Sequence, residues 1–230
     1  MKDNVPYHLG IIIDGNRRWA AKRGLPAIIG HRQGSKNVKK IGKLCRKAGV
    51  KILTLYAFST ENWSRPEKEV NCFMGLIIET LGKKNIRDLH KDNIKIRIIG
   101  QKERFSKPIR KLIKEAEELT KNNKNGILNV ALSYGGRAEI IEAVKKIIKK
   151  KIPLEKINEK LFEENLWTEK QPFPDLIIRT GGVKRLSNFL PWQSAYSELY
   201  FSDKYWPDFT EKDLNTAFEE YNQRQRRFGR

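Results

Sequence analysis

Six short segments of the chain are nearly continuous in apolar residues, and longer segments with a helical pattern separate them. Strands with one face in water alternate apolar and polar residues, whereas strands buried on both faces, as in parallel sheets, do not. The lack of alternation therefore predicts the strands of a parallel sheet. These predicted strands span residues 8–14, 51–58, 94–100, 127–134, 175–181 and 198–201.

The segments between the strands carry apolar residues three or four positions apart, which is the pattern of an amphipathic helix. Helices are predicted over residues 36–48, 67–91, 108–120 and 140–148, and a last one begins at Thr210, where Asp213 completes a capping-box pattern. Strands that alternate with helices indicate an α/β fold. We therefore predict a single domain over residues 1–230, with a central, mostly parallel six-stranded sheet flanked by helices.

The charge of the chain adds a class of partner to this picture. The 230 residues include 47 Lys and Arg against 27 Asp and Glu, a formal net charge of +20 at pH 7. Such an excess attracts nucleic acid, phosphorylated substrates or an anionic membrane surface. The lysines of 145–153 also fit a solvated helix face. No signal-peptide pattern opens the chain and no apolar run approaches ~18 residues, so we expect a cytoplasmic protein.

Polar residues and glycines follow four of the predicted strands, at the point where each strand ends. The carboxyl ends of parallel strands share one edge of the sheet, where ligands of open α/β folds bind. Arginine side chains and glycine N–H groups suit phosphate oxygens, and a carboxylate beside them suits Mg²⁺. Asp14 is therefore a candidate Mg²⁺ ligand, and Glu198, at the start of the sixth strand, is a candidate second. The four segments are DGNRRW (14–19), STENWSRP (59–66), YGGR (134–137) and RTGGVKRLSNF (179–189).

Other common phosphate and metal motifs do not occur in the chain. It has no GxxxxGK[ST] loop, no GxGxxG after a strand, no HExxH and no cysteine–histidine zinc pattern. Of the three histidines, His31 in GHRQG is the one that we expect to serve the edge of the sheet. The sequence by itself therefore predicts a site for phosphate groups and Mg²⁺ without naming its substrate.

Longer motifs identify a family. They are HLGIIIDGNRRWA, GHRQG, LTLYAFSTENWSRP, LNVALSYGGR, DLIIRTGGVKRLSNFLPWQSAYSELYF and RRFG. Together they resemble the cis-prenyltransferase family, the undecaprenyl and polyprenyl diphosphate synthases or isoprenyl transferases, from about His8 to Gly229. The resemblance implies an enzyme that condenses isopentenyl diphosphate with an allylic diphosphate, farnesyl or geranylgeranyl diphosphate, and forms a cis-polyprenyl diphosphate, the lipid-carrier precursor for glycan synthesis.

The resemblance also implies a site for the allylic diphosphate after the first two strands. Asp14 would bind Mg²⁺ and act in catalysis with Asn62, which together with Ser59 would lie near the reacting centre. Trp19 and Trp63 would wall the isoprenoid, with plain core packing as the alternative for each. The other contacts to this substrate would come from Gly15, Asn16, Arg17, Arg18, His31 and Arg65.

A second site would hold isopentenyl diphosphate. The resemblance assigns its diphosphate contacts to Arg179, Arg185 and Ser187, and the second carboxylate of the metal site to Glu198. Dimeric members of the family end in an Arg-x-Gly element. In a homodimer, the neighbouring subunit's site would therefore be completed by Arg227 and Gly229 of the final RRFG.

The product would grow in a tunnel between the long predicted helix and the central strands, and ordinary core packing explains the same residues equally well. The tunnel residues would be Val70, Phe73, Met74, Ile77, Ile78 and Leu81. Three positions depart from the family: Ala27 stands where many members have a basic residue, Arg17 where some have glycine, and Val183 where many have an acidic residue. The base that takes the proton stays open between Asp14, Asn16 acting through water, and the diphosphate itself.

Two other functions compete with this interpretation. A nucleic-acid-binding protein would explain the charge, but no known reading module occurs and the arginines gather at strand ends, so we expect no nucleic-acid partner. A non-catalytic subunit of a prenyltransferase complex would have lost the aspartate of DGN, which this chain keeps. The basic excess also suits peripheral association with an anionic membrane, where long polyprenyl products go.

Overall fold

The structure is a computed structural model that describes residues 5–224. Its six strands form one sheet in the order β3-β4-β2-β1-β5-β6, and every neighbouring pair is parallel. The strands are β1 (His8–Ile12), β2 (Ile52–Ser59), β3 (Ile94–Ile99), β4 (Gly126–Tyr134), β5 (Leu176–Arg179) and β6 (Glu198–Phe201). The predicted α/β fold is confirmed, and its sheet is parallel throughout. That residues 1–230 form a single domain stays a prediction.

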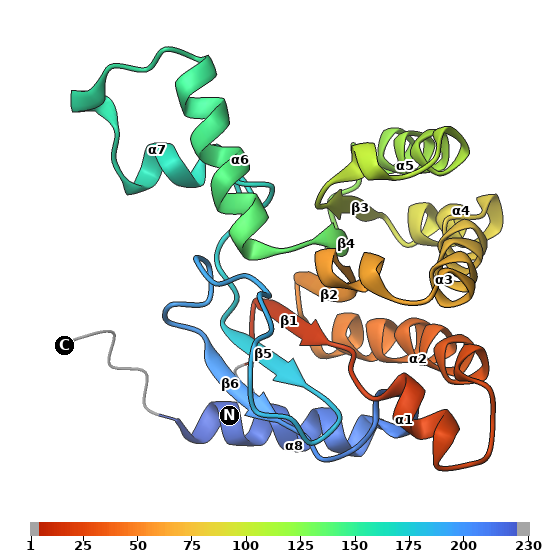
Figure 1. Ribbon diagram of the computed structural model, residues 1–230. Coiled ribbons are helices and arrows are strands. Elements are labelled where there is room, and N and C mark those ends of the chain that lie inside the picture. Colours follow the sequence, from red (N-terminus) through yellow and green to blue (C-terminus); the bar gives the residue numbers. More distant parts are fainter. Residues whose placement is uncertain (1–4, 225–230) are drawn as a thin grey trace.

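Helices and loops cover both faces of this sheet, which explains why its strands read as unbroken apolar runs. Leu9 and Ile11 of β1 pack in one core with α2 and α8, whereas Ile12 packs on the other face with Tyr56 and Phe189. Figure 1 shows α6 and α7 extending away from the sheet as an arm. The helices are α1 (Asn16–Ala21), α2 (Ala27–Ala48), α3 (Glu67–Thr80), α4 (Lys83–Lys91), α5 (Lys107–Thr120), α6 (Gly136–Lys149), α7 (Glu159–Glu163) and α8 (Glu211–Gln223).

Two helix predictions had wrong boundaries. The single helix predicted over 67–91 is two helices, because α3 ends at Thr80 and Gly82 caps α4 in an extended conformation. Leu81 between them is buried, so the apolar pattern runs on although the helix does not. At the start of α8, the predicted capping box between Thr210 and Asp213 is confirmed.

The helix predicted from residue 36 begins nine residues earlier, at Ala27. Two glycines in its first turns hid it, since glycine weakens a helix pattern. Their reason is packing: a Cβ on Gly30 would lie 2.0 Å from the Asn16 carbonyl oxygen, and one on Gly34 would lie 2.3 Å from Asn16 Oδ1. Their bare surface lets α2 touch the start of α1, so that His31 lies beside the end of β1.

Candidate active site at the carboxyl ends of the strands

A cavity of about 930 Å³ opens where β1, β2 and β5 end. Most of the residues predicted for the two substrate sites line this one cavity. They are Asp14, Gly15, Asn16, Arg17, Arg18, His31, Ser59, Asn62, Arg65, Arg179, Arg185 and Ser187. The shared edge of a parallel sheet thus brings together side chains that are far apart in sequence, as the strand pattern predicted.

Asp14 follows β1 and lies at the centre of a network of cationic and backbone donors. Its Oδ1 accepts a hydrogen bond from the Gly15 N–H at 2.6 Å and lies 3.2 Å from Arg18 Nη2, and its Oδ2 accepts one from Arg179 Nη2 at 2.9 Å. Burial alone would raise the pKa of this carboxyl. The hydrogen bond from Arg179 and the charges of Arg18 and Arg179 outweigh burial and hold the pKa below its ordinary value. Asp14 is therefore an ionised carboxylate facing the cavity.

The turn after Asp14 depends on Gly15 and on the segment before α8. Gly15 has φ of +105°, and a Cβ there would lie 2.7 Å from the Tyr205 ring. The Asp14 carbonyl oxygen accepts hydrogen bonds from the Thr180 hydroxyl at 2.7 Å and the Trp206 N–H at 3.0 Å. Left-handed backbone suits glycine, and the two donors fix the peptide behind the carboxylate. The DG pair of the first motif therefore aims the Asp14 side chain into the cavity.

Arg179, at the end of β5, is a buried arginine, and its side chain is 6% exposed. Its Nη1 donates to the Arg185 carbonyl oxygen and to Ser187 Oγ at 2.7 Å, while Nη2 holds Asp14. Its Nε is buried and has no hydrogen-bond partner among the described residues. The guanidinium thus ties the loop after β5 to the end of β1, which leaves little of it to bind a substrate directly.

The loop after β5 carries the other predicted contacts for isopentenyl diphosphate. Arg185 and Ser187 are exposed at the mouth of the cavity. Ser187 and Asn188 both have left-handed backbone, with φ of 49° and 66°. Non-glycine residues adopt this conformation at a cost, and it is often found at functional sites. Asn188 Nδ2 donates to Glu61 Oε1 at 3.0 Å, so this loop is tied to the segment after β2.

After β2, a short 3₁₀ helix (Thr60–Ser64) positions the second set of residues. The Asn62 side-chain oxygen accepts the Ser59 N–H at 3.0 Å, so the two residues predicted near the reacting centre hold each other in place as a capping box. Arg65 follows this turn, and its Nη1 lies 2.8 Å from Glu69 Oε1 in the first turn of α3. Glu69 was not predicted for the site, because its partners are apparent only in three dimensions.

His31 lies between the polar cavity and the apolar interior. The ring packs on Phe73 in a tilted arrangement, with 4.3 Å between the ring centroids, and neither ring nitrogen has a hydrogen-bond partner among the described residues. Burial lowers the pKa of His31 to about 4, although the nearby carboxylate of Glu69 acts in the opposite direction. His31 is therefore a neutral imidazole at pH 7, at the point where the cavity turns apolar.

The large cavity continues inward as two smaller ones. A cavity of about 140 Å³ shares Ile13, Asn16, His31, Ala57 and Phe73 with it and is otherwise lined mainly by apolar side chains of the sheet, α2, α3 and α4. A further cavity of about 520 Å³ shares five residues with the second, namely Val38, Leu55, Thr80, Leu89 and Leu128, and reaches the opposite edge of the sheet. A channel thus runs from the polar mouth along the face of the sheet. It is mainly apolar in the cavity of about 140 Å³, and charged side chains such as Lys43 and Asp92 surround its far end.

Of the predicted tunnel residues, the structure places only some on this channel. Phe73, Ile77 and Leu81 line the 140 Å³ cavity. Val70 and Met74 pack against the neighbouring core, and Ile78 is 45% exposed on the outer side of α3. The core-packing alternative therefore describes the first two, and the prediction for Ile78 was wrong.

The structure also corrects the prediction for the two tryptophans, since neither lines any of the three cavities described above. Trp19 turns outward: its Nε1 donates to Asp208 at 2.6 Å, and the Arg23 guanidinium lies 4.2 Å from its ring. Trp63 Nε1 donates to Ser133 Oγ at 2.8 Å, and its ring packs on Phe58. Trp63 is partly buried and packs against the core, and Trp19 joins α1 to the segment before α8.

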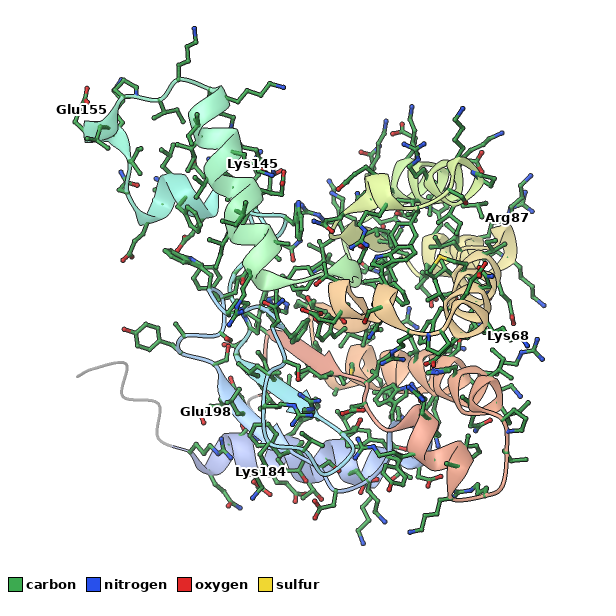
Figure 2. All side chains as sticks on the ribbon, in the orientation of Figure 1. Lys68, Arg87, Lys145, Glu155, Lys184 and Glu198 are labelled. Carbon is green, nitrogen blue, oxygen red and sulfur yellow. The ribbon has the colours of Figure 1, made fainter. Side chains whose placement is uncertain are left out.

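Glu198 lies at the wrong edge of the sheet to share a metal ion with Asp14 of the same chain. In the parallel register Glu198 is level with Leu176 and thus with Leu9, at the amino ends of the strands. Two strands of lateral spacing and five residues of rise put Asp14 and Glu198 more than ~15 Å apart. Figure 2 shows Glu198 at the tail of β6, away from α1, and its Oε2 accepts a 2.7 Å hydrogen bond from Arg224. The remaining predicted residues, Arg227 and Gly229, lie outside the described residues.

The donor set around Asp14 suits an ion that is held mainly by its substrate. Within residues 5–224, no three His, Cys, Asp or Glu side chains come together to form a metal cage. Mg²⁺ needs no such cage, because it commonly takes one or two carboxylates together with substrate phosphates and water. One ionised carboxylate in a cavity lined by arginines fits that use.

An arginine-lined mouth with an ionised carboxylate, followed by an apolar channel, defines a protein that binds phosphate esters of apolar chains. The comparisons with known proteins make this class specific. Residues 12–229 match the family described as "Putative undecaprenyl diphosphate synthase". The chain belongs to this family, whose members are cis-prenyltransferases.

Three relatives illustrate the match. The isoprenyl transferase of Clostridium perfringens is 50% identical over 100% of this chain and 92% of its own length. The farnesyl-diphosphate-specific ditrans,polycis-undecaprenyl-diphosphate synthase of Pasteurella multocida is 48% identical over 99% and 96% of the two chains. The crystal structure of lavandulyl diphosphate synthase from Lavandula x intermedia, in complex with dimethylallyl diphosphate, superposes with a TM-score of 0.93 at 38% identity, over 98% and 99% of the two chains.

Proposed function

We propose that the chain condenses isopentenyl diphosphate with an allylic diphosphate, farnesyl or geranylgeranyl diphosphate, and releases a cis-polyprenyl diphosphate that serves as a lipid carrier for glycan synthesis. One observation carries the proposal: the cation-lined cavity of about 930 Å³ shares residues with an apolar cavity behind it. A phosphate ester of an isoprenoid has the same two parts. Its head suits the arginines, and its chain suits the channel.

Arginines stand on both sides of Asp14, as two diphosphates require. Arg17 and Arg65, from the segments after β1 and β2, would hold the allylic diphosphate. Arg185 and Ser187, from the loop after β5, would hold isopentenyl diphosphate. The allylic C–O bond breaks, diphosphate leaves, the double bond of isopentenyl diphosphate forms the new C–C bond, and a proton departs. Donors fixed before the reaction stabilise the charge that develops on the leaving oxygen.

Mg²⁺ is part of the proposal. Asp14 would hold the ion together with phosphate oxygens of the substrate, and the ion would neutralise charge on the diphosphate. The proton acceptor stays open between Asp14, Asn16 acting through water, and a diphosphate oxygen. Because Arg179 and Arg18 keep Asp14 ionised, the chain presents this carboxylate to either role without a prior proton loss.

We further propose a homodimer. On α6 the apolar side chains of Ile141, Val144 and Ile148 form one exposed stripe, a surface that a second copy would cover. The family resemblance of the final RRFG supports a contribution of Arg227 and Gly229 to the partner's site. Glu198 is paired with Arg224 and lies too far from Asp14 of the same chain to share a metal ion with it.

Membrane contact is the remaining part of the proposal. Among the described residues, no helix has the length and apolar character needed to cross a bilayer. The net charge of +20 supports peripheral attachment of a cytoplasmic enzyme to the anionic inner face of the membrane.

The test is to incubate the purified chain with farnesyl or geranylgeranyl diphosphate and isopentenyl diphosphate, with Mg²⁺ or with a chelator. We expect diphosphate release that depends on Mg²⁺, and products whose masses differ by whole isoprene units. Diphosphate release when one of the two substrates is left out would contradict the proposal. So would the absence of diphosphate release with every allylic primer. Retention of RNA or DNA at physiological salt with no turnover would support the nucleic-acid alternative.

A further inference from the structure

One carboxylate outside the cavity joins three side chains that line it. Glu69 Oε1 lies 2.8 Å from Arg65 Nη1 and 3.7 Å from His31 Nε2, and Glu69 Oε2 lies 3.5 Å from Arg17 Nη1. The three partners come from α1, α2 and the turn after β2. Among the ion pairs of residues 5–224, those of Glu69 are the ones that connect all three elements around the proposed primer site.

The order of the groups in space decides what this carboxylate can do. Arg17, Arg65 and His31 line the cavity, whereas Glu69 does not, and its side chain is 12% exposed. Seen from the cavity, the Glu69 carboxylate therefore lies behind the guanidinium groups of Arg17 and Arg65. Any diphosphate in the cavity meets the guanidinium groups first, and the charge of Glu69 is screened from it by them.

The position of Glu69 in its helix is favourable without any ligand. It lies in the first turn of α3, where backbone N–H groups favour a carboxylate. Arg17 and Arg65 are long side chains, 56% and 30% exposed, and would otherwise sample many rotamers in water. Fixing both of them before the substrate arrives removes an entropic cost from substrate binding.

We propose that Glu69 is a positioning residue for the allylic diphosphate: it holds Arg17 and Arg65 as a pair, in the orientation that clamps the phosphates. This inference rests on the proposed function and adds to it a residue that does not touch the substrate. If Glu69 acted only through its charge, its removal would have the opposite effect on substrate affinity. Deleting a negative charge near a cationic site should strengthen anion binding.

The experiment is direct binding of a non-reactive allylic thiodiphosphate by calorimetry, on the full chain, followed by steady-state kinetics. For Glu69→Gln we expect about tenfold weaker binding of the analogue, a change of about 1.4 kcal/mol. We also expect a similar rise in KM for the primer and a kcat within about threefold of the unchanged chain. The KM for isopentenyl diphosphate should hardly change. Glu67→Gln is the matched control, since Glu67 lies in the same turn, is exposed and has no ion pair among the described residues.

A double-mutant cycle separates positioning from a general structural effect. In the Arg65→Ala background, Glu69→Gln should weaken binding much less than it does alone, because its main partner is gone. Glu69→Asp, which keeps the charge but shortens the reach, should give an intermediate loss and serves as the second variant if Glu69→Gln does not fold. Equal or tighter binding by a folded Glu69→Gln or Glu69→Asp would overturn the inference. Failure of the unchanged chain to bind the analogue would instead reject the proposed function.

Discussion

Arg179 Nη2 lies 2.9 Å from Asp14 Oδ2, and the two side chains belong to the ends of neighbouring parallel strands. The same guanidinium holds the loop after β5 through Ser187 and the Arg185 carbonyl oxygen. An arginine predicted to bind isopentenyl diphosphate thus fixes the carboxylate that we propose as the Mg²⁺ ligand. We therefore expect Arg179 to affect substrate binding mainly through Asp14 and the loop.

Replacing Asp14 should remove catalysis. We expect Asp14→Ala and Asp14→Asn to lower kcat by orders of magnitude, because the ionised carboxylate and the ion it would hold are lost. Asp14→Ala also leaves the buried guanidinium of Arg179 without its anion, so a loss of stability of about 3 kcal/mol is expected. Diphosphate release and thermal melting measure the two effects. Activity within about tenfold of the unchanged chain would contradict the assignment.

Arg179 and Arg185 should behave differently when each is changed to alanine. The side chain of Arg185 is exposed and has no ion-pair partner among the described residues, so Arg185→Ala should raise KM for isopentenyl diphosphate about tenfold without lowering the melting temperature. Arg179→Ala should lower both kcat and melting temperature. Without Arg179 the pKa of Asp14 rises. The contribution of the ionised Asp14 carboxylate to the free energy of unfolding is then lost at a higher pH as the solution is acidified. Identical profiles for the two variants would argue against this division of roles.

The channel should set the length of the product. Val38 of α2 lines both inner cavities, so a larger side chain there narrows their junction. We expect Val38→Phe to shift the products to shorter chains while the first condensation proceeds at nearly its normal rate. Ile78→Phe is the control, because Ile78 is exposed on the outer side of α3. Mass analysis of the products measures their length. Unchanged product lengths for Val38→Phe would show that the growing product does not pass the junction of the two inner cavities.

Stability should fall in acid partly through His8. Its Nδ1 donates to the Pro172 carbonyl oxygen and its Nε2 accepts from the Thr54 hydroxyl, both at 2.7 Å, so the buried ring is neutral. Burial lowers its pKa from 6.5 to about 4. The unfolded chain then binds the proton first. The stabilising contribution is complete above pH 6.5, decreases as the pH falls below that value, and is fully lost near pH 4.

At pH 5 this loss amounts to about 2 kcal/mol relative to neutral pH. Urea unfolding at pH 7 and pH 5 measures it. His8→Gln should lower stability at pH 7 and show a smaller further decrease at pH 5, and an unchanged pH dependence would contradict the assignment. His31, whose pKa is also about 4, should contribute in the same direction.

The final RRFG should act across the dimer. Removing Arg226 to Arg230 should leave a folded dimer with very low turnover, because Arg227 and the Gly229 N–H would no longer reach the partner's substrate. Mixing this truncated chain with Asp14→Ala should restore part of the activity, since one hybrid site then keeps both groups. Two inactive parents that exchange subunits and stay inactive would rule out this action. A helix-end role alone predicts a small loss of stability, about 0.3–1 kcal/mol for each arginine, and normal turnover.

The fold could be predicted from sequence because burial on both faces leaves a direct mark on each strand. The first motif was informative for the same reason: an apolar run that ends in Asp14 and Gly15 must place a carboxylate at the edge of the sheet. Helix ends were harder. The apolar pattern passes through Leu81 and Gly82 although the helix does not, and the glycines of GHRQG make the start of α2 look irregular.

Partners across the fold could not be predicted. Glu69 reads as an ordinary acidic residue at a helix start, and its three neighbours come from other elements. Glu198 was assigned to the metal site as a carboxylate near the polar segments and again by resemblance, but strand direction places it at the opposite edge of the sheet. Trp19 and Trp63 stand beside motif residues in sequence, and their side chains point elsewhere because successive positions of a turn face different directions.

The contact of Gly30 and Gly34 with Asn16 bears on how tolerant this chain is to random mutation. At these two positions even the addition of a single methyl group would push α2 away from the turn that carries Asp14. A saturation scan scored by cell growth would therefore rank them beside Asp14, although neither glycine has a functional group to offer a substrate. A position that tolerates no substitution in such a scan can therefore be one where two backbones lie close together as well as one that takes part in the chemistry. At this site positions of both kinds lie within a few residues of each other.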